Sequence, residues 1–394
     1  MQFSAAKSKK EYFFSQPHQP FFTLGIFNAI IFMILFIPAY KGHFSFDSKF
    51  FHAYSMVYMV FTNFFFGFLY TTFPRFSGTS PIESKKYLTV FFINLFASLS
   101  FIVTLFLPFA FFATSIFVLI SFFITLKIFY SIFNECKLPK KDQYWLIVAL
   151  GIGAISNILF FIYAIPCGCD KSIIYQTALN FAIYMYLIFL GFVVAFRMVP
   201  FFSHVMSWKK NELLHILIFV LFLTHSFLSS TFPKFLFIPD TLAAILLIIE
   251  LKNINLSKSK EPLLWILHLA IYWLPLALLL GSLSEFAREW FGIYLFQLPI
   301  HLLVLGFLTT VLIGFGTRVT IGHSGNILKV DKTTVYIFYF TQIVLLFRII
   351  FSIAGYFGKI TPFFDISATL WLILFLWWGG KYFKVLAFGE RIKV

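Results

Sequence analysis

The chain has 394 residues, of which 60% are hydrophobic and only 11% are charged, and it contains 61 Phe. A soluble domain is about half apolar and about a quarter charged, so this composition excludes an ordinary soluble protein. The formal net charge is +15, but the basic residues are dispersed and form no stripe with interleaved aromatics, so nucleic-acid binding is not predicted.

Apolar segments long enough to cross a bilayer recur along the whole chain, each near the span length of about 20 residues. Short polar stretches join them, so the sequence predicts an all-α, polytopic integral membrane protein. We expect a single membrane domain over residues 21–388, between a cytoplasmic N-terminal segment, 1–20, and a tail, 389–394. The twelve predicted helices are 21–40, 52–73, 87–107, 109–133, 143–166, 174–198, 212–231, 238–252, 262–282, 295–317, 333–357 and 363–387.

The loops between these segments differ in their basic residues. Every even-numbered loop holds three or four Lys or Arg residues, whereas the odd-numbered loops hold two at most. Loops rich in Lys and Arg stay in the cytoplasm. The pattern predicts that both termini of this membrane protein lie in the cytoplasm.

A short motif recurs at every fourth segment. A Gly-Phe pair followed by an Arg ends the second, sixth and tenth predicted helices, at Gly67 and Arg75, Gly191 and Arg197, and Gly314 and Arg318. Chance can produce so short a match. If the repeat is real, it implies three four-helix arcs around a pseudo-threefold axis, with these three helices innermost.

Two histidines stand at the predicted outer ends of two of these inner helices, namely His52 and His301. Ionisable residues at membrane depth are costly and are therefore functional candidates. Two imidazoles at matching depth can supply both axial ligands of a haem iron. The alternative is a pair of polar residues hydrogen-bonded to water among the lipid headgroups.

Further candidate metal ligands lie near these helices. Met56 follows His52 by one helical turn, and a thioether beside an imidazole suits copper or a sixth haem position, although Met is also an ordinary packing residue. His225 in the seventh helix could complete a second metal site, or could be a polar residue hydrogen-bonded between helices.

Basic side chains mark two more places. Arg348 lies inside the eleventh helix, where it needs a partner such as a haem propionate, or must extend its head to the outer interface. At the cytoplasmic ends of the inner helices, Arg forks and His rings could hold haem propionates or another anion, or could be positive-inside charge with helix-capping roles. This inner group comprises His18, His204, His323, Arg75, Arg197 and Arg318.

Three separated motifs resemble the NnrS family over essentially the whole chain. They are Phe14–Phe22, the run from His52 to Met56 with its Gly67–Gly78 ending, and Thr317–Gly325. That family comprises bacterial membrane proteins associated with nitric oxide and nitrosative stress and described as binding haem and copper. The resemblance implies that its signature positions here are His18, His52, Met56, His301, Arg318 and His323.

Two positions depart from the pattern expected of the family. Tyr54-Ser55 stands where a His-Glu pair is expected, and Asn326 stands where a basic residue is expected. The architecture is also similar, at the level of fold alone, to the catalytic subunit of haem–copper oxidases.

These observations favour a haem- and copper-binding inner-membrane protein that handles nitric oxide, with the lipid bilayer and nitric oxide or a related small ligand as its partners. A secondary transporter of a small solute with twelve helices is the alternative. No halves repeat and no paired Gly/Pro-interrupted helices support that alternative.

Overall fold

The computed structural model describes residues 9–168, 170–205, 208, 211–256 and 259–391. These residues form helices and no strand, which confirms the all-α prediction. The chain divides into two compact units. Unit 1 comprises residues 1–143, 315–331 and 372–394, and unit 2 comprises residues 144–314 and 332–371. The expectation of a single membrane domain stays a prediction.

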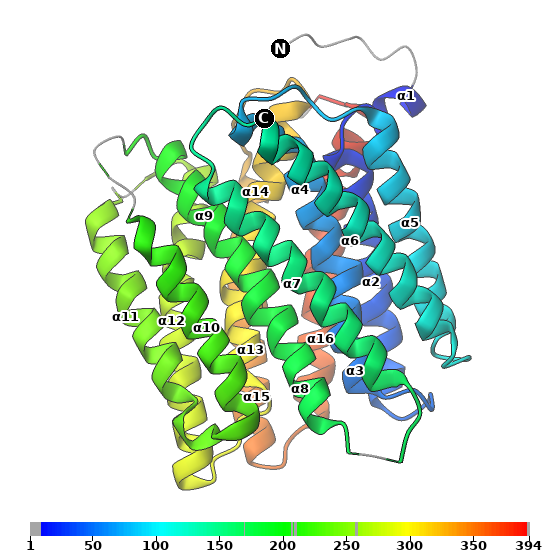
Figure 1. The fold of residues 1–394 in the computed structure, drawn as a ribbon, viewed down its shortest axis with the longest axis vertical. Coiled ribbons are helices and arrows are strands. Elements are labelled where there is room, and N and C mark those ends of the chain that lie inside the picture. The colour runs from blue at the N-terminus through cyan, green and yellow to red at the C-terminus, as the bar shows by residue number, and fades with distance from the viewer. Residues whose placement is uncertain (1–8, 169, 206–207, 209–210, 257–258, 392–394) are drawn as a thin grey trace. The chain divides into compact units, whose positions relative to one another are not determined.

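Unit 1 contains the first helices and the last (Figure 1). Its elements are α1 (Lys9–Phe13), α2 (His18–Tyr40), α3 (Ser48–Tyr54), the π-helical η1 (Ser55–Phe61), α4 (Thr62–Ser77), α5 (Ser84–Val103), α6 (Ala110–Glu135), the end of α14 (Thr310–His323) and most of α16 (Thr361–Phe388). Within this unit α2 packs against η1 and α4, and α5 packs against α6.

Unit 2 contains the middle of the chain and α15. Its elements are α7 (Lys141–Ala164), α8 (Ser172–Asn180), the π-helical η2 (Phe181–Ile188), α9 (Phe189–Phe202), α10 (Glu212–Thr231), the short η3 (Pro233–Phe235), α11 (Phe237–Ile254), α12 (Pro262–Phe291), α13 (Leu298–His301), the π-helical η4 (Leu302–Thr309), the start of α14 and α15 (Lys332–Tyr356). Here α12 packs against α11 and η4.

Eleven helices of the described chain are long and apolar enough to span a membrane. The remaining predicted segment forms α11, which carries Asp240, Glu250 and Lys252 and is therefore more polar. The two described ends of the chain meet in unit 1, because a Cβ on Gly389 would lie 2.7 Å from the Tyr12 ring.

The helices predicted to be innermost are the most buried. The apolar window of Ser48–Ser77 is 100% buried, that of Ser172–Phe202 is 94% buried and that of Leu298–His323 is 78% buried, against 61% or less for the other candidate spans. The predicted burial order is confirmed, and the arrangement as three arcs stays a prediction.

The repeated glycines mark close helix crossings. A Cβ on Gly67 would lie 2.9 Å from side-chain atoms of Phe21 and Phe22, and one on Gly314 would lie 2.8 Å from Leu267. A Cβ on Gly191 would lie 3.2 Å from Leu308 and Phe307. At each repeat position a larger residue would push two packed elements apart, which gives the recurring glycine a physical reason.

Each of the three inner helices also contains a π-helical segment a few residues before its repeated glycine. A π segment widens the helix and is frequent at functional sites. Threonines bond back to carbonyls five residues earlier, as Thr62 does to Val57 and Thr309 does to Val304, both at 2.8 Å. The three inner helices therefore share a π-helical segment in addition to the Gly-Phe and Arg motif of the sequence.

The widened backbone of η1 supports a buried polar network in unit 1. The Met59 carbonyl accepts a hydrogen bond from the side-chain amide of Asn28 and another from that of Asn63, both at 2.7 Å. Asn28 also donates to Ser98 at 2.9 Å, and Asn94 donates to Asn63 at 3.2 Å. In hydrocarbon every such group must find a partner inside the protein, and these amides do.

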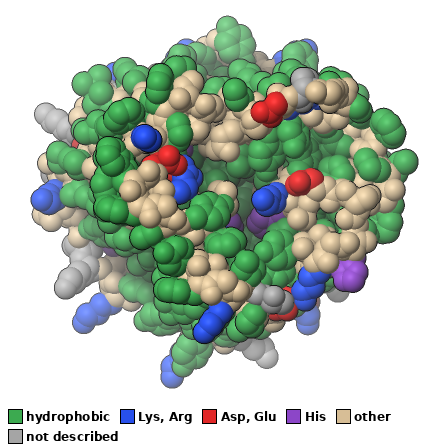
Figure 2. All heavy atoms as spheres, turned by 90° about the horizontal axis from the view of Figure 1, so that it is seen from below, with side chains coloured by type: hydrophobic (Ala, Val, Ile, Leu, Met, Phe, Trp, Pro, Cys, Tyr) green, Lys and Arg blue, Asp and Glu red, His purple; other side chains and the backbone are tan. Residues whose placement is uncertain are grey.

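Exposed apolar side chains follow helical spacing on the outward faces of several helices. On α5 they are Phe92, Phe96, Leu99 and Val103. On α10 they are Leu213, Ile216, Val220, Leu223 and Phe227. Stripes of this kind suit contact with lipid tails, and the end face in Figure 2 likewise shows mostly hydrophobic side chains with small groups of charged ones among them.

Candidate functional site

His301 ends the short helix α13 in unit 2, just before η4. The left-handed conformation of Gln297 (φ 56°) turns its carbonyl toward the imidazole, and the two lie 2.9 Å apart at His301 Nδ1. An Nδ1–H donated to this carbonyl leaves Nε2 with its lone pair. A metal-binding histidine is oriented in this way, with the second ring nitrogen held by a backbone oxygen.

Arg348 of α15 lies beside His301 and is 9% exposed. Its guanidinium donates to the Phe296 carbonyl at 2.7 Å and to the Ser352 hydroxyl, and its charged carbon lies 4.7 Å from the centre of the Phe351 ring. One of its nitrogens is also 3.1 Å from His301 Nδ1. Since the guanidinium can only donate, this contact competes with the shorter one to the Gln297 carbonyl. Arg348 thus lies inside the protein, packed against His301, the predicted haem ligand. The groups named here that contact its guanidinium are neutral.

His52 lies in unit 1, in the short helix α3, whose first turn is capped by Asp47 through a 2.6 Å hydrogen bond to the Phe50 amide. Its ring stacks on Phe36 with a centroid distance of 4.2 Å. Met56 follows in η1 and is buried. Because His52 and His301 belong to different units, their joint ligation of one haem stays a prediction.

At the end of unit 1 where α2 begins, His18 and His323 lie edge to face, with a centroid distance of 5.0 Å. His323 Nδ1 lies 2.7 Å from the Gln16 side-chain oxygen, so Nδ1 carries the proton. Its Nε2 therefore accepts from Arg75, 3.2 Å away. We name this group, with Gln19, the His18–His323 cluster.

The inner group predicted from the sequence is thus assembled in part. His18, His323 and Arg75 come together, and Arg318 lies half-buried in α14 of the same unit, whereas His204 and Arg197 belong to unit 2. Sequence reasoning missed Gln16 and Gln19, although both fall within the run Phe14–Phe22 that carries the first motif.

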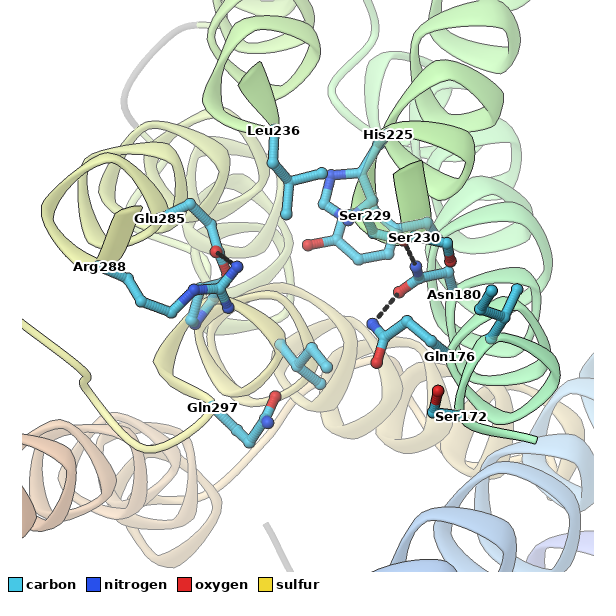
Figure 3. A pocket seen from close by; sticks show the side chains of 14 residues that line it. Ser172, Gln176, Asn180, His225, Ser229, Ser230, Leu236, Glu285, Arg288 and Gln297 are labelled. Carbon is cyan, nitrogen blue, oxygen red and sulfur yellow. Dashed lines mark hydrogen bonds and ion pairs between the residues drawn. The ribbon is translucent and has the colours of Figure 1, made fainter. Parts of the chain in front are cut away.

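A cavity of about 320 Å³ in unit 2 is lined mainly by polar side chains (Figure 3). Glu285 and Arg288 of α12 form one wall, joined by an ion pair of 2.7 Å. On the opposite wall Gln176 donates to Asn180 at 3.4 Å, and Asn180 donates to Ser229. The sequence had not indicated this cavity, because its lining comes from five separate elements.

His225 enters this cavity from α10. Its Nδ1 lies 2.9 Å from a carboxylate oxygen of Asp240, which is 1% exposed, and its ring stacks on Tyr184 with a centroid distance of 3.8 Å. A carboxylate on Nδ1 fixes the tautomer and leaves Nε2 as the potential ligating atom. His268, by comparison, is hydrogen-bonded to the Ser203 hydroxyl at 2.7 Å.

Among the described residues, no three side chains of His, Cys, Asp and Glu gather into a group that could ligate a metal ion. A haem needs fewer protein ligands, because the porphyrin supplies four of the ligands of the iron and the protein supplies only one or two side chains. The donor set therefore suits a haem better than a closed three- or four-residue metal centre.

Comparison with known families decides the relationship. The sequence model of the NnrS protein family matches residues 12–388, nearly the whole chain. The chain belongs to the NnrS family. No curated protein matches the sequence. Membership confirms the resemblance carried by the three motifs and supports a membrane protein related to the nitric oxide response.

Proposed function

We propose that this NnrS-family protein binds haem through His301, with His52 as the second axial ligand, and handles nitric oxide within the membrane. The carrying observation is the orientation of His301, whose Nδ1 is held by the Gln297 carbonyl at 2.9 Å, within a chain that matches the NnrS family over residues 12–388.

The neighbouring residues also suit a haem. Arg348 is buried next to His301, where its guanidinium could bind a propionate bidentately in exchange for the Phe296 carbonyl. The bound iron would supply a site for nitric oxide or for one-electron chemistry. Around it, this chain would fix the imidazole, balance the propionate charge and exclude water, which tunes the properties of the iron.

Nitric oxide is small and uncharged, and it partitions into lipid. The inner helices that carry both histidines are the most buried spans, so a ligand arriving from the bilayer would reach them through apolar packing. We place the protein in a bacterial inner membrane with both termini cytoplasmic, because the Lys- and Arg-rich loops alternate as the positive-inside rule requires.

A first experiment tests haem binding directly. Detergent-purified protein from haem-replete cells should show a Soret band and stoichiometric iron by elemental analysis. Colourless, iron-free protein would contradict the proposal and would favour the transporter alternative, for which the polar cavity of unit 2 would be the natural solute site.

Copper is proposed at His225, whose Nε2 is left available by the 2.9 Å bond between Nδ1 and Asp240. Replacing His225→Asn should remove most of the bound copper measured by elemental analysis. The matched control is His215→Asn on the same helix, because His215 is equally buried but packs against Trp145 and Phe192. Equal copper in both variants would exclude this site.

A further inference from the structure

The His18–His323 cluster contains two buried side-chain nitrogen atoms without hydrogen-bond partners. His18 is 2% exposed and Gln19 is fully buried, yet His18 Nδ1 and Gln19 Nε2 have no hydrogen-bond partner among the described residues. The Gln19 side-chain oxygen accepts hydrogen bonds from the Gln16 backbone N–H at 2.9 Å and from the Ser15 hydroxyl at 3.2 Å. These bonds fix the Gln19 side chain and leave its NH₂ group as the donor. A buried polar group left unsatisfied costs about 1–3 kcal/mol, so two such nitrogens in one cluster point to a missing hydrogen-bonding partner.

The electrostatic setting of these donors is positive. They stand on the first two residues of α2, a helix of 23 residues with no acidic residue in its first turn. A helix N-terminus carries a partial positive charge. Arg75 adds a full charge, and within the described chain it makes no ion pair with a carboxylate.

His323 holds Arg75 in place. Because its Nδ1–H is donated to Gln16, only its Nε2 lone pair faces the guanidinium. A neutral imidazole leaves the charge of Arg75 uncompensated and its other nitrogens available. His323 is therefore a positioning residue for Arg75.

The nearby phenol does not supply a negative charge. Tyr12 lies outside the spans, and burial raises the pKa of its hydroxyl above the ordinary value. It stays protonated at neutral pH. The cluster thus offers donors and positive potential, and the arrangement does not suit a metal cation.

We propose that the His18–His323 cluster binds a small oxyanion or carboxylate, whose oxygens accept hydrogen bonds from His18 Nδ1, Gln19 Nε2 and the Arg75 guanidinium. This site does not depend on haem at His301. The same chemistry could come from a free anion or from a haem propionate, and the experiment separates these two sources.

The experiment titrates the purified full-length protein with sodium formate and sodium nitrate, at constant ionic strength set by a bulky anion, and follows binding by calorimetry. We expect saturable binding that weakens at least tenfold in Arg75→Gln and in His18→Phe. The control is Lys85→Gln, which removes one positive charge from an exposed side chain after α4 and should bind as the wild type does.

Arg75→Lys is the control for misfolding, because it keeps the positive charge at residue 75 but loses the planar guanidinium that can donate two parallel hydrogen bonds. It should bind more weakly than the wild type while keeping the wild-type melting temperature. The Soret band should be equal in all these variants. Absence of saturable binding to the wild type would overturn the proposal, as would equal affinities in wild type and Arg75→Gln. Loss of haem from Arg75→Gln and His18→Phe without any anion binding would assign the cluster to a propionate instead.

Discussion

At the scale of single residues, the two ends of one span carry histidines with different surroundings. His301 has its Nδ1 against the Gln297 carbonyl, whereas His323 has Gln16 at one ring nitrogen and Arg75 at the other. Similar residues on one helix are therefore expected to have different roles, the first in metal ligation and the second in positioning a charge.

The different surroundings of His301 and His323 predict different haem spectra for variants at these two residues. His301→Ala removes an axial ligand without adding bulk, so a low-spin bis-histidine spectrum should become high-spin or disappear, and His52→Ala should do the same. His323→Ala should leave the spectrum unchanged, because it lies at the opposite end of the span Leu298–His323. Optical and electron paramagnetic resonance spectra of the three variants check this. The reverse pattern would place the haem at the other face of the membrane.

At the scale of elements, close packing at glycine decides how near the inner helices approach their neighbours. Gly67→Ala would place a methyl group 2.9 Å from Phe21 Cβ, in a part of unit 1 where the side chains are buried. We expect a destabilisation of about 1–3 kcal/mol, as overpacking of a close-packed core usually costs.

A matched control lies on α7. Gly151 has no atom within 4 Å of an added Cβ, so Gly151→Ala should be neutral or stabilising by up to about 1 kcal/mol through helix propensity. Thermal melting of the two variants in the same detergent gives the comparison. Equal melting temperatures would show that the crossing at Gly67 can relax.

The elements also show what a sequence can and cannot predict. Hydropathy located the spans well, because a lipid-crossing helix must be apolar over its whole length. The π segments could not be predicted, since Ser55–Phe61 has the same kind of composition as the α-helix after it. The pairing of His225 with Asp240 was also missed, because it joins α10 to α11 through a turn whose geometry the hydropathy pattern does not encode.

At the inner cluster the sequence identified the charged residues but not the amides. His18, His323 and Arg75 were predicted to lie together from helix direction alone, and they do. Gln16 and Gln19 gave no signal, because an amide near a helix start is ordinary capping chemistry. Only the three-dimensional structure shows that one orients His323 and the other keeps a donor unsatisfied.

At the scale of the whole molecule, Tyr12 and Gly389 lie close together near the two described ends of the chain. A Cβ on Gly389 would lie 2.7 Å from the Tyr12 ring, which places both described ends in the same part of unit 1. This agrees with the loop charges, which predict the Lys- and Arg-rich loops and both termini on the cytoplasmic side.

Fusion reporters test this topology. A fluorescent protein fused after residue 391 should fold and fluoresce, whereas alkaline phosphatase at the same point should be inactive because it needs an oxidising compartment. The control fusion in the loop between α7 and α8 should give the opposite result. An active phosphatase at the C-terminus would contradict the cytoplasmic placement of that end.

The π segment η4 also keeps the two ends of its span in phase. In an α-helix each residue turns the chain by about 100°, whereas a π bulge absorbs an extra residue in one widened turn, so the helix before it and the helix after it face nearly as they would without that residue. Deleting one residue from Leu302–Thr309 would let the segment close into a regular α-helix. His301 should then stay near Arg348 while Arg318 and His323 keep their places, so the widened turn is a local feature that can be removed without turning one end of the span against the other.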